Sequence, residues 1–336
     1  MVFLPYINLF RAIATLFVVV NHSIHGLQWG AEFDNLETSR ALKIVFSNAA
    51  LLFVFISGFL FQHLLYKYNY RTFLLSRFRL VILPYLIVSV PAVIAWVFVF
   101  QKSGWSIPPD FYSQPWWYRA GFFYITGQHM APLWFIPMIA MFYLLSPLFQ
   151  WIDQRPWLYC SIPLFMWLSY EVPRHWSPWI SFVHFFSVYL IGMAASRYKD
   201  RVLDWSYHYR YVLVSLFGLA VVWELTQTHY TQSYFNYLNK LVLCFLVIAL
   251  LHHYRDLKFG VLGWFAAINF SVFFLHTYAN VGMKLLFAGG PGTSIDIVGN
   301  IFYQAVYVFI LVLISVIICK LVQKMTGRYS KYLIGA

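Results

Sequence analysis

Residues 11–22 read RAIATLFVVVNH and place an arginine and a histidine at the two ends of an apolar stretch. Eleven helical steps of about 100° amount to roughly three full turns plus 20°, so Arg11 and His22 share one face of a helix. At about 1.5 Å per residue the two side chains lie about 16 Å apart along the axis, more than half the thickness of a bilayer's hydrocarbon core. The stretch predicts a membrane-spanning helix with an ionisable group near each end.

The composition extends this prediction to the whole chain. Of 336 residues, 61% are hydrophobic, 22% are aromatic and only 10% are charged, whereas about 25% of residues in a soluble domain are charged. Apolar segments of membrane-spanning length recur from end to end. We therefore expect an all-α, polytopic membrane protein with one transmembrane domain over residues 1–336.

Ten spans are predicted from these segments. They lie at about 5–25, 43–66, 80–100, 132–151, 157–171, 182–197, 211–229, 240–253, 261–286 and 299–322. A further segment at 116–128 is too short and interrupted to span, so we expect a re-entrant or interfacial helix there, with its aromatic side chains at the level of the lipid headgroups.

The basic residues predict how the chain is oriented. Fifteen of the 23 Lys and Arg residues fall in alternate loops on one side, while the loop at 30–40 on the other side is acidic. The fifteen are those at 67–79 and 197–210, those in the tail after residue 319, and Arg155, Arg255 and Lys258. Under the positive-inside rule the basic side is cytoplasmic. Both termini are then cytoplasmic, Arg11 lies toward the cytoplasm, and His22 lies toward the exterior. This pattern accounts for the net charge of +12 without nucleic-acid binding.

Arg11 and His22 each allow a structural and a functional interpretation. An arginine inside a span can snorkel to the headgroups, pair with a buried carboxylate such as Glu224, or line a watery cavity. A histidine there can form a hydrogen bond between helices or take part in a pathway. Because the two residues share one face, the pathway is the favoured interpretation.

The spacing of the histidines and cysteines predicts no metal site. His22 and His25 are three residues apart, which suits metal ligands, but no third ligand is evident. The three cysteines are dispersed in apolar segments and indicate neither a disulfide framework nor a metal site. His276 lies in the apolar run NFSVFFLH at 269–276, five residues after Ser271, and either lines a cavity or packs in the core.

The stretch YKYNYRTFLLSRFRLVILPY at 66–85 carries four cations: Lys67, Arg71, Arg77 and Arg79. Topological anchoring is one explanation for them. The other is a binding site for an anionic cytosolic ligand, because guanidinium groups bind phosphates through paired hydrogen bonds. The phosphates of coenzyme A would suit such a site.

Several motifs in order resemble the acyltransferase 3 family of integral-membrane acyltransferases. They are the Arg11 and His22 pair, LLFVFISGFL at 51–60, RFRLVILPYL at 77–86, PLWFIPMIAMFYLLSPLF at 132–149, FFSVYLIGMAAS at 185–196 and FSVFFLH at 270–276. Val81 departs from the pattern, since members often carry an arginine three residues before the loop-end proline. Arg77 and Arg79 are the nearest substitutes for that arginine.

The resemblance implies a membrane O-acyltransferase that moves an acyl group, usually acetyl, from cytosolic acyl-coenzyme A to a hydroxyl group of an exopolysaccharide or cell-surface glycan. It implies a location in a bacterial cytoplasmic membrane, where a polysaccharide synthesis or secretion complex would be a partner. His22 would act as a base or as an acylated relay, with Arg11 beside the donor. The donor itself would be bound by Lys67, Arg71, Arg77 and Arg79, and the substrate cavity would involve Trp134, Tyr143, Ser271, His276 and Glu224.

Two functions of other classes fit the composition. An exporter or flippase of polysaccharide or lipid-linked sugar would also use many spans, aromatic residues and buried charges, but the sequence contains no convincing internal repeat of the kind that transporters carry. A structural subunit of a secretion complex would leave the Arg11 and His22 pair unexplained.

Overall fold

The computed structural model describes residues 4–29, 33–102, 107–175, 177–227, 234–256, 260–290 and 293–335, without the side chains of residues 33–36. The acidic loop predicted at 30–40 and the end of the span predicted at 211–229 lie in part outside the described residues. The helices are α1 (Pro5–Ser23), α2 (Phe33–Phe46), α3 (Ala50–His63), α4 (Tyr70–Arg77), α5 (Leu83–Ile94), α6 (Trp116–Thr126), α7 (Phe135–Leu144), α8 (Ser146–Asp153), α9 (Ile162–Glu171), α10 (Pro178–Arg197), α11 (Lys199–His208), α12 (Arg210–Leu225), α13 (Tyr234–His253), α14 (Gly260–Phe287), α15 (Ile301–Thr326) and α16 (Ser330–Leu333).

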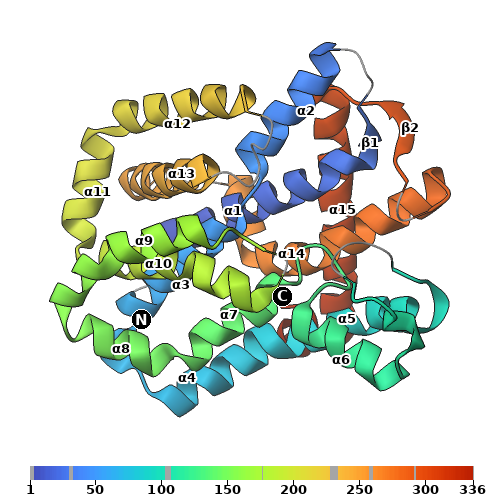
Figure 1. The fold of residues 1–336 in the computed structure, drawn as a ribbon, viewed down its shortest axis with the longest axis horizontal. Coiled ribbons are helices and arrows are strands. Elements are labelled where there is room, and N and C mark those ends of the chain that lie inside the picture. The colour runs from blue at the N-terminus through green and yellow to red at the C-terminus, as the bar shows by residue number, and fades with distance from the viewer. Residues whose placement is uncertain are drawn as a thin grey trace.

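The described residues form an all-α protein with one small sheet (Figure 1). Strands β1 (Leu27–Gln28) and β2 (Ile295–Val298) pair in parallel. The sheet joins the segment just after α1 to the segment just before α15. It therefore fixes the end of α1 that carries His22.

Seven helical segments are long and apolar enough to cross a membrane. They are Pro5–Gly26, Glu37–His63, Tyr70–Val99, Pro178–Arg197, Tyr234–His253, Gly260–Phe287 and Ile301–Leu333, and an eighth is formed if the bent pair α7 and α8 counts as one span. These segments confirm a multi-pass helical membrane protein. The predicted count of ten spans and the cytoplasmic placement of the termini stay predictions.

The segments that account for the difference in count are short or broken. α7 and α8 are bent by 56° relative to each other, because Pro147 lies in the first turn of α8 and cannot donate a backbone hydrogen bond to the preceding turn. α9 has 10 residues and α12 has 16. At about 1.5 Å per residue neither reaches the thickness of a hydrocarbon core of about 30 Å.

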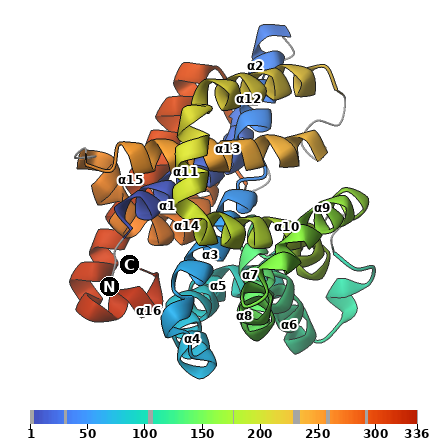
Figure 2. The same ribbon diagram turned by 90° about the vertical axis from the view of Figure 1, so that its left-hand side faces the viewer.

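α1 lies in the middle of the helix assembly (Figures 1 and 2). It packs on α3, α13, α14 and α15, and its side chains Phe10, Ala14 and Val18 are part of the main hydrophobic core. Both ends of α1 are therefore surrounded by other helices. Polar side chains on α1 therefore face other helices or internal cavities.

Two glycines allow α3 and α10 to pack closely. A Cβ at Gly58 would overlap the carbonyl group of Tyr189, and a Cβ at Gly192 would overlap that of Phe55. The two backbones thus lie in direct contact, as small residues permit between membrane helices. A larger residue at either position would therefore clash with the backbone of the other helix.

The basic stretch at 67–79, expected as a loop, is mostly helical. Asn69 caps α4 by accepting a hydrogen bond from the backbone N–H of Thr72 at 3.1 Å. α4 continues through a π-helical segment, Phe78–Ile82, into α5. Arg71 and Arg77 therefore project from α4, Arg79 projects from the π-helical segment, and Lys67 lies in a short 3₁₀ turn before α4.

Candidate functional site

His22 and His276 lie against each other. His22 is on the last turn of α1, and His276 is in the middle of α14. The Nε2 atom of His276 is 3.4 Å from the Nδ1 atom of His22, and the two rings stack with centroids 5.6 Å apart. The structure thus joins two histidines that are far apart in the sequence.

The hydrogen bonds around the two rings assign their protons. The Nδ1 atom of His276 is 3.0 Å from the carbonyl oxygen of Val272 and donates to it, which leaves a lone pair on Nε2 toward His22. The His22 ring also contacts the backbone of Val18. With Nδ1 of His22 as the donor, its Nε2 atom keeps a lone pair that can accept a proton.

The backbone of His22 is held by a second set of contacts. Asn280, one helical turn after His276, donates to the His22 carbonyl oxygen at 3.2 Å. The hydroxyl group of Tyr307 donates to the side-chain oxygen of Asn280 at 2.7 Å. On the next residue, Gln304 donates to the hydroxyl oxygen of Ser23 at 2.7 Å. α14 and α15 therefore hold the backbone at the end of α1 that carries His22.

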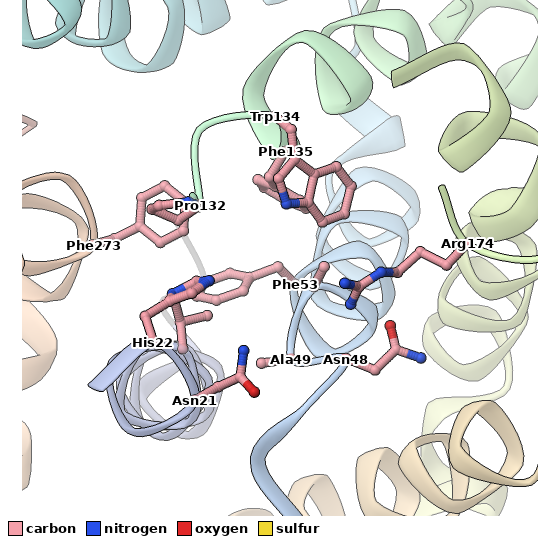
Figure 3. Close-up of a pocket in the computed structure, with 12 residues that line it drawn as sticks. Asn21, His22, Asn48, Ala49, Phe53, Pro132, Trp134, Phe135, Arg174 and Phe273 are labelled. Atoms are coloured by element: carbon pink, nitrogen blue, oxygen red, sulfur yellow. The ribbon is translucent and has the colours of Figure 1, made fainter. Parts of the chain in front are cut away.

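A small pocket opens beside His22 (Figure 3). Its volume is about 40 Å³ and it is lined by residues of α1, the break between α2 and α3, the segment before α7, and the segment after α9. Asn48 lies in that break, in a left-handed conformation with φ of 56°, which asparagine tolerates better than most residues. Asn48 of the break and Asn21 of α1 are thus polar residues in the lining of the pocket.

Arg174 and Trp134 form the opposite wall of this pocket (Figure 3). The Arg174 guanidinium lies 5.5 Å from the centroid of the Trp134 ring, a distance typical of a cation–π contact. Trp134 also stacks on Phe185 with centroids 6.4 Å apart. The predicted cavity residue Trp134 is thus near His22.

A second group of predicted residues gathers at the other end of α1. Arg77 lies with its guanidinium 5.7 Å from the centroid of the Tyr143 ring, and Arg11 is within electrostatic reach of both residues. Neither arginine forms an ion pair with a carboxylate in the described part of the chain. The Nε atom of Arg77 is buried and has no acceptor among the described residues. Two cations without an anionic partner suit a negatively charged ligand.

The other predicted donor residues point outward. Lys67, Arg71 and Arg79 are exposed. Only Arg77 of the four turns inward from α4.

Ser271 and Glu224 lie away from both groups. Ser271 is buried beside Cys319 of α15. Glu224 is buried in α12 and accepts a hydrogen bond from Asn236 at 2.8 Å, so it does not accompany Arg11. Neither residue lines the pocket beside His22 or the larger cavity next to it.

That larger cavity has a volume of about 990 Å³ and shares Asn21, His22 and Arg174 with the small pocket. Neither Arg11 nor Arg77 lines it. His22 therefore faces open space at one end of α1, and the paired arginines lie at the other end.

Sequence reasoning missed Arg174 and Asn280. Arg174 is in a segment without periodicity, so no pattern pointed to it. Asn280 carried a signal, because residues four apart share a helix face and His276 was already a candidate. The pair predicts one polar patch on α14.

The arrangement supports proton transfer at His22 and anion binding near Arg11. A neutral imidazole with a free lone pair that faces a cavity can act as a general base. Within the described residues there is no group of three or more His, Cys, Asp and Glu side chains that could hold a metal ion.

A family model described as an acyltransferase domain matches residues 4–320. No curated protein and no solved structure shows a significant match to the chain. The matched range contains both groups of site residues on α1.

Proposed function

The chain belongs to the acyltransferase domain family and is a multi-pass membrane acyltransferase, and from this premise we propose that it transfers an acetyl or related acyl group from cytosolic acyl-coenzyme A to a hydroxyl group of a glycan. The observation that carries the proposal is the contact between His22 and His276 toward the end of α1 opposite to Arg11 and Arg77. An exopolysaccharide or cell-surface glycan is the acceptor we favour.

The donor would be bound at the Arg11 end. Arg11 and Arg77 are within electrostatic reach of each other and form no ion pair with a carboxylate in the described part of the chain, and guanidinium groups suit the phosphates of coenzyme A. The slender pantetheine arm would then extend along α1 toward His22. A span of about 16 Å separates the two ends.

The chemical step would take place at His22. Its Nε2 atom accepts the proton of the acceptor hydroxyl while the hydroxyl oxygen attacks the thioester carbonyl carbon. The resulting tetrahedral intermediate collapses, the carbon–sulfur bond breaks, and the coenzyme A sulfur leaves and receives the proton from His22. His276 is a positioning residue that keeps the proton of His22 on Nδ1. Transfer through an acylated His22 is the alternative route.

The experiment that tests this function measures release of coenzyme A from acetyl-coenzyme A by the purified protein, with and without added surface glycan from the producing cells. We expect release that increases with glycan and yields O-acetylated product. Transport of glycan across proteoliposomes with no coenzyme A release would support an exporter instead.

The direction of transfer can be tested by thiol labelling. In a Cys160→Ser background, which removes an exposed cysteine, Asp296→Cys places a thiol on β2 at the His22 end and Asp200→Cys places one on α11. Both aspartates are exposed. We expect an impermeant maleimide added to intact cells to label the Asp296→Cys protein, and to label the Asp200→Cys protein only after permeabilisation. The reverse pattern would contradict transfer toward the exterior.

A further inference from the structure

The cavity beside His22 is large enough for a substrate. Its volume of about 990 Å³ lies at the upper end of the range for small-molecule sites. Side chains of α1, α2 and α14 and of the segments after α5 and α6 line it. His22 is part of its wall, so a molecule in this cavity reaches the proposed base directly.

The charges of this cavity have one sign. Four cationic side chains line it: Lys43, Lys102, Arg174 and Lys284. Among the described residues no aspartate or glutamate lines it, and none of the four cations forms an ion pair with a described carboxylate. Lys284 has an exposed fraction of only 8%. Unpaired cations in a confined space are costly unless an anion joins them.

Two of these cations are held in place by aromatic rings and backbone. The Nζ atom of Lys102 donates to the carbonyl oxygen of Gln128 and lies 5.6 Å from the centroid of the Trp96 ring. Burial lowers the pKa of Lys102 to about 8, so this side chain is still mostly charged at pH 7. Arg174 is held over Trp134 in the same way. The positive charge is therefore present before a ligand arrives.

A neutral histidine, His129, also belongs to the wall of the cavity. The Nδ1 atom of His129 lies 3.0 Å from the carbonyl oxygen of Phe123 and donates to it, while its Nε2 atom is buried without a partner among the described residues. Burial lowers the pKa of His129 to about 4, which keeps the ring neutral at pH 7. Trp96 also lines the cavity.

We propose that the acceptor of this acyltransferase is an acidic glycan, whose carboxylate or phosphate groups are bound in the His22 cavity by Lys43, Lys102, Arg174 and Lys284. This inference rests on the proposed function, because it names the substrate class of the same site. The anionic groups fix the sugar chain, and a neighbouring hydroxyl group is presented to His22.

The phosphates of the donor are the other anions that could occupy this cavity. The geometry favours the acceptor, because Arg11 and Arg77 are a separate pair of cations at the opposite end of α1 and neither lines the cavity. Two anionic substrates would thus be bound at two ends of one helix. The test must therefore measure both ligands.

The experiment measures equilibrium binding to the purified full-length protein in detergent. The probes are tetragalacturonate, which carries a carboxylate on each sugar, neutral maltotetraose, and coenzyme A. We expect tetragalacturonate to bind at least about tenfold more tightly than maltotetraose at low salt, and this preference to shrink as salt is added.

Charge variants locate the binding site. The double variant Lys43→Gln with Lys284→Gln should lose about tenfold in affinity for tetragalacturonate, with unchanged affinity for coenzyme A. The double variant with Lys43→Arg and Lys284→Arg should keep most of the affinity, which shows that charge is the cause. The matched control is Lys320→Gln with Lys324→Gln, since both lysines are exposed on α15 and the change in net charge is the same. We expect this control to bind tetragalacturonate normally.

Each of three results would contradict either the acidic acceptor or acyl transfer itself. Equal affinity for the two tetrasaccharides would overturn the inference, and so would a parallel loss of coenzyme A affinity in the glutamine double variant, because the cavity would then hold the donor. A preference for the acidic probe in a protein that releases no coenzyme A from acetyl-coenzyme A would support the anion site and contradict acyl transfer. The two proposals can therefore fail separately.

Discussion

His22→Gln reduces acyl transfer by about 10²–10⁴-fold, the contribution that a positioned general base typically makes. Glutamine keeps a polar side chain of similar reach but has no lone pair that accepts a proton near neutral pH. Its amide can still contact His276, which lies 3.4 Å from the His22 ring, so the helices should pack as before. The measurement is the rate of coenzyme A release and of O-acetyl product formation by the purified variant, with an unchanged elution profile in gel filtration.

The control is His208→Gln, because His208 is exposed on α11 and far in sequence from both groups on α1. This variant should transfer acyl groups at the wild-type rate. Wild-type turnover by a folded His22→Gln protein would exclude His22 as base and as relay. Incubation with acetyl-coenzyme A alone separates these two roles, since only a relay would give a His22-containing peptide that is heavier by one acetyl group.

The sequence predicted the first helix well, because its signal is local. Residues 5–25 were expected to span, and the structure has a candidate span at Pro5–Gly26. The helical repeat placed Arg11 and His22 on one face without knowledge of any neighbour. The motifs likewise indicated the family that the matching model confirms.

The number of spans was harder to predict from composition. Hydropathy shows whether a segment prefers lipid, but it does not show where the backbone bends. The segment at 132–151 is apolar throughout, yet it bends by 56° between α7 and α8. The predicted span at 157–171 consists of a 3₁₀ segment followed by the short helix α9. Both segments contain prolines, which interrupt the helical hydrogen-bond pattern.

The cations of the large cavity could not be grouped from the sequence. Lys43, Lys102, Arg174 and Lys284 come from four segments separated by tens of residues. No periodicity links them, and each alone has the ordinary explanation of a basic residue near a membrane surface. Only the packing of α1, α2, α5 and α14 around one space brings them together.

The same limit applies to the donor end, where four cations were predicted to bind the donor and Arg77 and Arg79 were the nearest substitutes for the family arginine. α4 turns Arg77 toward Tyr143 and Arg11, while Arg71 and Arg79 are exposed. A loop would have given all four similar access to a ligand. A helix separates them by the direction in which each side chain leaves the backbone.

Arg77→Lys and Arg11→Lys should each raise the Michaelis constant for acyl-coenzyme A by about 10- to 100-fold, although the formal charge is kept. Lysine lacks the planar group that forms two parallel hydrogen bonds with a phosphate. Neither arginine forms an ion pair with a described carboxylate, so a phosphate group would be the anionic partner of both. The measurement is initial rate against acyl-coenzyme A concentration at saturating glycan.

Arg79→Lys is the matched control, because Arg79 follows Arg77 by two residues and is exposed. Its Michaelis constant should change by less than about threefold, since exposed charge pairs contribute little. Equal effects at Arg77 and Arg79 would mean that a diffuse positive field attracts the donor, and added salt would then weaken both variants and the wild type alike. Unchanged constants in Arg77→Lys and Arg11→Lys would assign both arginines to anchoring of the helices. A specific loss at Arg11 and Arg77 alone would place the donor phosphates between α1 and α4, about 16 Å along α1 from His22.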